Sequence, residues 1–136
     1  MIVVFDSLTG QSKRFASKLG YEIISVDDYY DEDEEIFLVT RTFNFGQIPV
    51  PTVEFLNDYH DRVIGTAVSG NRNWGTNYGK AGDKIRDLYK IPLVLKFEGS
   101  GFDRDVEIVK KWIEENKKGV WYDGKEKCNT RMGIIK

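Results

Sequence analysis

The stretch that decides the fold is Met1-Ile2-Val3-Val4-Phe5-Asp6-Ser7-Leu8-Thr9-Gly10-Gln11-Ser12. It consists of an apolar run, a turn rich in hydroxyl groups, and the first residues of a helical pattern that continues to Leu19. The apolar run from Met1 to Phe5 shows no alternation with polar residues, which is typical of a strand buried on both faces. The stretch therefore predicts a strand, a turn and a helix in direct succession.

The turn at residues 7–12 is a candidate phosphate site. The first N–H groups of a helix lack partners within it and lie at the positive end of its dipole, so hydroxyl groups placed there suit a phosphate dianion. The alternative is local: Ser12 or Thr9 caps the helix, and Gly10 relieves a tight turn. The turn alone leaves both interpretations open, because short Ser/Thr/Gly patterns recur by chance.

The composition is that of an ordinary globular protein. The chain has 136 residues, 40% of them hydrophobic and 31% charged, and a formal net charge of −2. Single domains cluster at about 100 to 150 residues, so we expect one domain over residues 1–136, ending in a tail, 119–136, whose pattern is ambiguous. No apolar run approaches the roughly 20 residues that span a bilayer, and no signal-peptide pattern is seen. We expect a cytoplasmic protein without a membrane partner.

Several classes of function are disfavoured by the residue types present. Cys128 is the one cysteine and His60 the one histidine, so we expect no internal disulfide, zinc site or Ser-His-Asp triad. The charge pattern shows no basic face, which argues against a nucleic-acid partner. The acidic run 27–35 lacks the glycine and ligand spacing of a calcium loop, so we interpret it as a solvated connector and expect no metal.

Strand-like and helical patterns alternate along the chain. Strands are expected at 1–5, 21–26, 36–40, 62–68 and 91–97, and helices at 11–19, 51–59, 76–90 and 103–118. This alternation predicts an α/β fold, with a doubly wound parallel sheet, helices on both faces and right-handed crossovers. No helix fits between the second and third strands, so the acidic connector is expected to cross in irregular form.

Some helix details are also predicted. Pro51 is expected at the first position of its helix, and Asp103 is expected to cap the last one. In the helix at 76–90, the apolar residues with helical spacing are Ala81, Ile85, Leu88 and Tyr89, which we expect to face the sheet.

Three loops are expected to meet at one edge of the sheet. In parallel sheets, ligands bind beyond the carboxyl ends of the strands, where the strand order reverses. The loops 6–12, 41–48 and 69–79 follow the first, third and fourth strands. They are therefore predicted to form one site.

The two later loops carry aromatic residues where polar turn residues are usual. Phe43 and Phe45 flank the second loop's centre, and Trp74 and Tyr78 lie among glycines and asparagines in the third. Aromatic faces stack on flat ligands, so these loops and the phosphate turn together describe a mononucleotide with a planar head. FMN meets that description. The alternatives are a surface aromatic over an apolar patch and a hydrophobic lid on the sheet end.

No catalytic residue is assigned, and the candidate cofactor-binding residues all come from the three loops. They are Ser7, Leu8, Thr9, Gly10, Gln11, Ser12, Thr42, Phe43, Asn44, Phe45, Gly46, Ser69, Gly70, Asn71, Asn73, Trp74 and Gly75.

The charges of the three loops predict how a bound flavin behaves. Asp6 is their acidic residue, against Arg41 and Arg72, so the ligand is expected in a slightly positive surrounding. A nearby positive charge favours an anionic reduced flavin by a few kcal/mol at most, at an effective dielectric constant of ~20, and eases full reduction. Gly46 is a candidate for a peptide that reorients toward the flavin, since glycine tolerates both orientations, although an ordinary turn glycine is the alternative.

The whole pattern resembles the NrdI family, small flavodoxin-like FMN proteins that work with class Ib ribonucleotide reductase. The resemblance rests on the segments 7–12, 45–49, 68–75 and 91–98, of which Ser-Gly-Asn-Arg-Asn at 69–73 is the most specific. It implies a flavodoxin-like sheet of five strands in the order 2-1-3-4-5, with the helix missing between strands two and three. The acidic connector and the tail depart from the family pattern, so no family role is assigned to them.

The resemblance also implies a function. The reduced FMN protein would react with O2 and supply superoxide or peroxide to the dimanganese small subunit of class Ib ribonucleotide reductase, on which the metal and tyrosyl-radical cofactor is assembled. The implied partners are that subunit and an electron donor similar to flavodoxin or thioredoxin reductase. Two other functions stay open: a general flavodoxin-type electron carrier, and a cofactor-free binding module of the same fold.

Overall fold

The computed structural model describes residues 1–31, 33–44 and 46–118, in which strands and helices alternate as predicted. The strands are β1 (Ile2–Phe5), β2 (Glu22–Ser25), β3 (Ile36–Arg41), β4 (Val63–Ser69) and β5 (Leu93–Phe97). The α-helices are α1 (Gln11–Ser17), α2 (Val50–Tyr59), α3 (Lys80–Tyr89) and α4 (Asp103–Asn116), and the 3-10 helices are η1 (His60–Arg62) and η2 (Arg72–Asn77).

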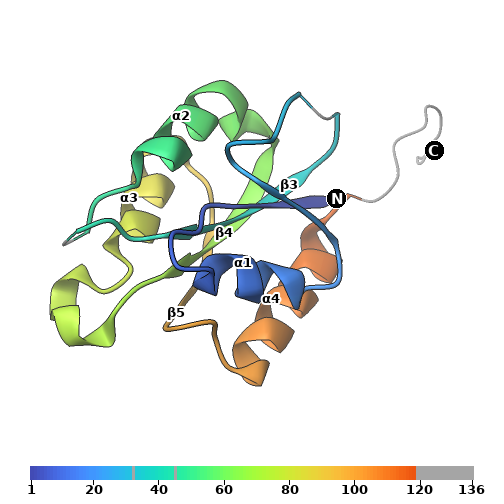
Figure 1. Cartoon of the computed structure of the whole chain (residues 1–136). Helices are drawn as coiled ribbons and strands as arrows, with labels where there is room; N and C mark the ends of the chain where they lie inside the picture. The colour runs from blue at the N-terminus through green and yellow to red at the C-terminus, as the bar shows by residue number, and fades with distance from the viewer. Residues whose placement is uncertain (32, 45, 119–136) are drawn as a thin grey trace.

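The strands form one parallel sheet in the order β2-β1-β3-β4-β5, which confirms the predicted fold class. Helices α1 and α4 cover one face of the sheet, and α2 and α3 cover the other (Figure 1). The described part of the connector between β2 and β3 contains no helix, as predicted.

Strand β1 shows why an apolar run without alternation makes a central strand. Its successive side chains point to opposite faces of the sheet. Val3 and Phe5 pack in the core beneath α1 and α4, whereas Ile2 and Val4 pack in the core beneath α2. Since both faces are covered by helices, every residue of β1 is buried.

The acidic connector is anchored at its middle and at its C-terminal end. The Asp31 carboxylate lies 2.8 Å from the Arg62 guanidinium, and the Glu35 carboxylate accepts a hydrogen bond of 2.8 Å from the Lys118 N–H. These contacts offset part of the repulsion among the acidic side chains. The prediction of a solvated connector is therefore incomplete, because this segment is also fixed to η1 and to the residues that follow α4.

The predicted start of the third helix is wrong by one turn. Residues 76 and 77 belong to η2, and α3 begins at Lys80. Gly75 has φ 57° and ψ −121°, which ends regular helical geometry, and Gly79 has a left-handed conformation with φ 59° as the residue before α3. Glycine adopts these dihedral angles without steric cost, so the loop bends twice before the helix starts.

The predicted sheet-facing side of α3 is confirmed at Ala81 and Ile85, which are buried, and is wrong at Leu88. Leu88 is 69% exposed, whereas Gly82 is buried against Leu93. A Cβ atom on Gly82 would lie 2.7 Å from Leu93 Cδ1, so the small residue lets α3 approach β5. The helical spacing of apolar residues assigned Leu88 to the buried face. It gave no signal for Gly82, because a glycine has no apolar side chain to count.

Two predicted helix ends are shifted by one residue. Helix α2 begins at Val50, so Pro51 is its second residue, where its missing N–H also costs no intrahelical bond. Asp103 is the first residue of α4 and not its cap. The N–H of Phe102 is instead bound by the Asp105 carboxylate at 2.8 Å. The predicted tail at 119–136 lies outside the described residues.

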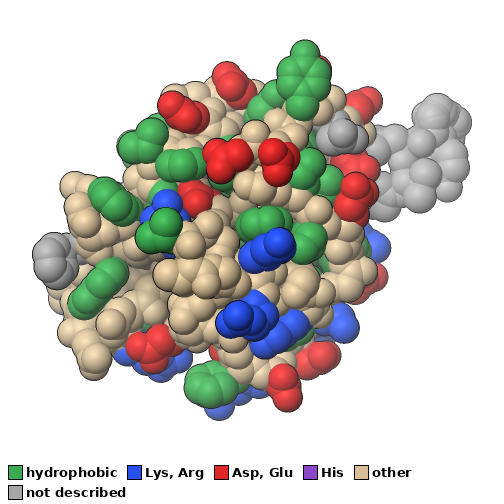
Figure 2. All heavy atoms as spheres, viewed as in Figure 1, with side chains coloured by type: hydrophobic (Ala, Val, Ile, Leu, Met, Phe, Trp, Pro, Cys, Tyr) green, Lys and Arg blue, Asp and Glu red, His purple; other side chains and the backbone are tan. Residues whose placement is uncertain are grey.

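The outer surface of α1 is basic, a feature that the sequence analysis did not recognise. Figure 2 shows Lys and Arg side chains gathered over this helix, and Lys13, Arg14 and Lys18 are exposed. Among the described residues, no helix has the length and apolar character needed to cross a membrane.

A close contact between β4 and α4 generates a stability prediction. A Cβ atom on Gly65 would lie 2.6 Å from the ring of Trp112, so Gly65→Ala overpacks this contact. We expect a loss of about 1–3 kcal/mol in the free energy of unfolding, measured by urea denaturation. Combining it with Trp112→Leu, which removes the obstructing ring, should cost less than the sum of the two single changes. Additive losses would contradict the contact.

Candidate functional site

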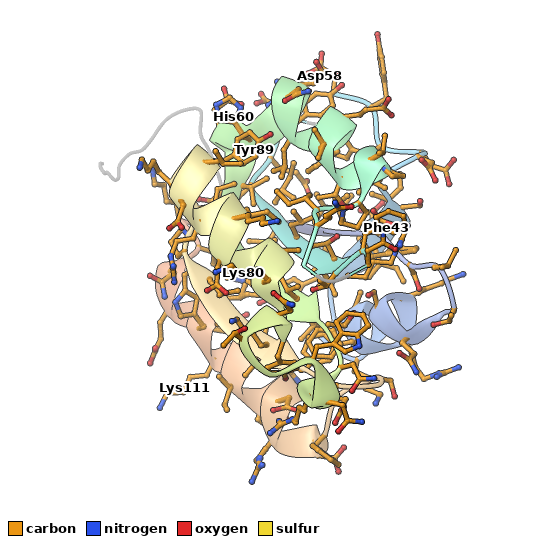
Figure 3. All side chains as sticks on the ribbon, turned by 90° about the vertical axis from the view of Figure 1, so that its left-hand side faces the viewer. Phe43, Asp58, His60, Lys80, Tyr89 and Lys111 are labelled. Carbon is orange, nitrogen blue, oxygen red and sulfur yellow. The ribbon has the colours of Figure 1, made fainter. Side chains whose placement is uncertain are left out.

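A cleft of about 420 Å³ lies at the carboxyl edge of the sheet, within the size range of small-molecule sites. Figure 3 looks onto this edge of the sheet, with Phe43 labelled on the loop after β3 and Lys80 at the start of α3. The loops after β1, β3, β4 and β5 all contribute, so the predicted convergence of three loops is confirmed and a fourth joins them. The lining residues are Ser7, Leu8, Thr9, Gln11, Ser12, Arg41, Thr42, Ser69, Gly70, Asn71, Trp74, Glu98 and Gly99.

Most of the predicted site residues line the cleft: Ser7, Leu8, Thr9, Gln11, Ser12, Thr42, Ser69, Gly70, Asn71 and Trp74. A second group lies in the same loops but outside the lining: Gly10, Phe43, Asn44, Gly46, Asn73 and Gly75. Phe45 lies outside the described residues.

The turn before α1 presents its polar groups to the cleft. Gly10 precedes the helix in a left-handed conformation, with φ 91°, and donates its N–H to Ser7 Oγ at 2.9 Å. No side chain caps α1, so the interpretation of Ser12 or Thr9 as its cap is wrong. Ser12 is buried, and its Oγ lies 3.5 Å from Ser69 Oγ at the end of β4. The first N–H groups of α1 are therefore left for a ligand or water.

The loop after β3 is a tight turn beside the cleft. Phe43 N donates to Gln47 O at 2.7 Å, and Gln47 N donates to Phe43 O at 2.8 Å. Gly46 has φ 122°, and a Cβ atom there would lie 2.9 Å from Lys80 Cβ. Both the dihedral angle and the contact with α3 require glycine at this position. Its suggested reorientation toward a ligand stays a prediction.

The loop after β4 is held by backbone bonds and a side-chain turn. Gly70 N donates to Phe97 O at 2.9 Å, and Asn73 N donates to Asn71 Oδ1 at 2.9 Å. Trp74 N donates to Asn71 O at 3.0 Å, and Trp74 is one of the residues that line the cleft. These bonds fix the aromatic wall of the cleft to the end of β4.

Tyr78 does not serve the site as the sequence suggested. Its ring packs behind Gly70, where a Cβ atom would lie 3.2 Å from Tyr78 Cδ1, and it does not line the cleft. Arg72 lies over the ring, 5.5 Å from its centroid. Burial raises the pKa of Tyr78, an effect that the Arg72 charge opposes. Tyr78 therefore supports the loop, and Trp74 is the aromatic residue of this loop that a ligand in the cleft would contact.

Sequence reasoning missed Arg41, Glu98 and Gly99 as lining residues. Arg41 is part of a predicted loop, but the sequence analysis considered only its contribution to the net charge of the loops. Glu98 and Gly99 follow β5, whose carboxyl end lies at the same edge as those of its parallel neighbours. The position of the fifth strand was the signal that could have identified them.

Glu98 changes the charge balance that the sequence suggested. The Glu98 carboxylate lies 3.8 Å from Arg72 Nε, and Asp6 lies 3.2 Å from Arg41 Nε. Each arginine thus has an acidic partner at the cleft. The expected positive surrounding is replaced by a balanced one, because the loop after β5 was left out of the charge count.

Asp6 is buried behind the cleft and holds three elements together. One carboxylate oxygen binds Arg41 Nε, and the other accepts a hydrogen bond of 2.6 Å from Thr52 Oγ1 on α2. Thr40 Oγ1 lies 2.7 Å from Thr52 Oγ1. Since the Thr52 proton is directed to Asp6, Thr40 donates to Thr52. This network joins the ends of β1 and β3 to the first turn of α2.

The donor set fits a phosphorylated planar ligand. Hydroxyl and backbone N–H groups from the turn at 7–12 face the cleft from the side of α1, and Trp74 faces it from η2. A hydrophilic anion-binding wall and an aromatic wall in one cleft match the two ends of a flavin mononucleotide.

A five-stranded parallel sheet in this order, with its cleft at the carboxyl edge, defines a flavodoxin-like protein. The structure is similar to oxidised flavodoxin 1 from Bacillus cereus, with a TM-score of 0.63, 21% identity, and coverage of 84% of this chain and 94% of that one. It is also similar to a Fusobacterium nucleatum flavodoxin bound to flavin mononucleotide, with a TM-score of 0.60, 14% identity, and coverage of 84% and 94%.

The sequence defines the family more narrowly. Residues 3–111 match the family described as "NrdI Flavodoxin like". The chain is 42% identical to "Protein NrdI" of Macrococcus caseolyticus over 116 residues, which cover 85% of this chain and 90% of that protein. The chain therefore belongs to the NrdI family of flavodoxin-like proteins, and the resemblance seen in the sequence is confirmed.

The Asp6 network generates a second stability prediction. Thr52→Val removes the hydroxyl that binds the buried carboxylate, and we expect a loss of about 1.5–3 kcal/mol in the free energy of unfolding, measured in urea. Thr52→Ser is the matched control, because it keeps the donor and loses only a methyl group, for a cost of roughly 1 kcal/mol. Equal stabilities of the Val and Ser variants would contradict a stabilising hydrogen bond to Asp6.

Proposed function

We propose that the chain binds FMN in the cleft and, in its reduced form, uses O2 to supply superoxide or peroxide to the dimanganese small subunit of class Ib ribonucleotide reductase. The oxidant would serve to assemble the metal and tyrosyl-radical cofactor of that subunit. The observation that carries the proposal is a cleft with a hydroxyl-rich turn on one side and Trp74 on the other, in a chain of the NrdI family.

Different residues of the cleft would bind the phosphate and the ring system of FMN. The turn at 7–12, with Ser69, offers hydroxyl and N–H donors to the phosphate. Trp74 offers a face for the isoalloxazine ring, and stacked aromatic pairs contribute about 0.5–1.5 kcal/mol beyond their buried area. Thr42 also lines the cleft, and its hydroxyl donates a hydrogen bond of 3.0 Å to Ser69 O, which joins the ends of β3 and β4.

The charges around the cleft suit a cofactor that is reduced and then meets oxygen. Bound FMN would supply electrons that convert O2 to superoxide or peroxide. The negative charge of Asp6 is balanced by Arg41 and that of Glu98 by Arg72, so little uncompensated negative charge opposes reduction. An electron donor similar to flavodoxin or thioredoxin reductase would reduce the protein in the cytoplasm.

A general electron carrier is the second candidate function. It rests on the similarity to flavodoxins, one of which is bound to flavin mononucleotide. The two functions share the fold and the cofactor and differ in the partner and in the use of oxygen. A cofactor-free binding module would instead leave Trp74 and the hydroxyl turn without a ligand.

Flavin binding is tested with the purified apoprotein. We expect it to bind FMN and quench the flavin fluorescence, and Trp74→Ala to weaken binding by about tenfold, since stacking area is lost. Trp74→Phe keeps an aromatic ring and should lose less. The control is Phe102→Ala, which removes an exposed ring outside the cleft and should leave affinity unchanged. A wild-type protein that fails to bind FMN would refute the cofactor assignment.

Radical assembly separates the activator from the electron carrier. The reduced FMN-loaded protein is mixed with the manganese-loaded small subunit of a class Ib reductase and O2, and the tyrosyl radical is measured by electron paramagnetic resonance. We expect a radical yield well above that with free reduced FMN or with the apoprotein. A yield equal to these controls, from a protein that binds and reduces FMN normally, would favour the carrier.

A further inference from the structure

Arg41 is a cleft residue whose one contact named so far is its ion pair with Asp6. It is the last residue of β3, it lines the cleft, and its side chain is 20% exposed. An arginine side chain this far removed from water needs an acidic partner. Its partner is Asp6, whose side chain is 5% exposed.

The Asp6 carboxylate fixes the guanidinium from one side. The bond of 3.2 Å is made through Nε of Arg41, while the second oxygen of Asp6 is bound by Thr52 at 2.6 Å. A guanidinium has five N–H donors in a rigid planar fork, and Nε accounts for one of them. The terminal nitrogens are the part that can meet an anion in the cleft.

Arg41 lies at the hydroxyl-rich side of the cleft. Its Cα partner across the sheet is Ser69, whose Oγ is 3.5 Å from Ser12 Oγ on α1. Its ion-pair partner Asp6 directly precedes Ser7, the first residue of the turn. Arg72, the other arginine of these loops, lies instead above Tyr78 and pairs with Glu98, and its side chain is 56% exposed.

We propose that Arg41, oriented by Asp6, binds the phosphate of the mononucleotide and makes the cleft select a flavin phosphomonoester over riboflavin. The inference deepens the proposed function and rests on it. Arginine binds phosphate through paired N–H donors with a geometry that the ammonium group of lysine does not reproduce. Asp6 balances the arginine charge, and it orients Arg41 without touching the ligand.

The structure also allows a competing role, in which Arg41 only neutralises the buried Asp6. The two roles differ in what happens to ligands with and without a phosphate. A residue that binds phosphate affects FMN and leaves riboflavin unchanged. A residue that only supports the fold affects both flavins together.

The test compares the affinity of the full-length apoprotein for FMN and for riboflavin, by quenching of flavin fluorescence. Arg41→Gln should weaken FMN binding by about 10- to 100-fold and change riboflavin binding by less than about threefold. Arg41→Lys should fall between these results, because it keeps the charge without the fork. Arg72→Gln is the matched control and should leave the ratio of the two affinities unchanged.

A second readout uses inorganic phosphate alone. Phosphate should raise the thermal midpoint of the wild-type apoprotein more than that of Arg41→Gln, since the variant has lost a phosphate ligand. If Arg41→Gln fails to fold, Asp6→Asn combined with Arg41→Gln removes both buried charges and carries the same expectation for the two flavins.

The outcomes separate this inference from the proposed function. Equal weakening of FMN and riboflavin, or an unchanged ratio of affinities in all Arg41 variants, would overturn the role in phosphate binding. Wild-type protein that binds neither flavin would refute the proposed function itself. Selective loss of FMN binding in the Arg41 variants supports the inference.

Discussion

Parallel pairing of β1, β3, β4 and β5 is the constraint on which the rest of the structure depends. Parallel strands end at the same edge of the sheet, so the segments that follow them become neighbours although they are far apart in sequence. Ser12 and Ser69 meet in this way, with their hydroxyl oxygens 3.5 Å apart. The cleft is therefore a consequence of the strand order, and its chemistry is a consequence of the four segments.

The pairing depends in turn on burial of the sheet from both sides. β1 is apolar at each position because its side chains enter two separate cores, one beneath α1 and α4 and one beneath α2. Its first polar residue, Asp6, is buried as well, and Arg41 and Thr52 supply the partners that a buried carboxylate requires. Two consecutive residues thus have different roles: Phe5 belongs to the hydrophobic core, and Asp6 belongs to the polar network behind the cleft.

Much of this arrangement could be predicted from the sequence. The run at 1–5, the acidic connector without a helix, and the three loops with hydroxyl, glycine and aromatic residues are local patterns. They predicted the parallel α/β sheet and most of the cleft, whereas the strand order came from the family resemblance. The cleft-lining role of Trp74 followed from a bulky ring in a segment too polar to be core. The family resemblance gave the same fold independently.

The remaining features depend on contacts between distant residues. Tyr78 and Trp74 have the same sequence surroundings, and only the packing of Tyr78 behind Gly70 separates their roles. Glu98 reaches the cleft because β5 lies beside β4. On α3, Gly82 lies against Leu93, whereas Leu88 is exposed. Helical periodicity shows which face the apolar side chains share. It does not show that a glycine on another side of the helix can pack directly against a strand.

The packing of Trp112 into the space above Gly65 has an evolutionary consequence. The ring occupies the volume that a side chain on β4 would fill, so neither position can change size independently. Among relatives of this chain, a larger residue at the position of Gly65 should be accompanied by a smaller one at that of Trp112. The pair would therefore appear as correlated substitutions in a family alignment, on the face of the sheet shared by α1 and α4.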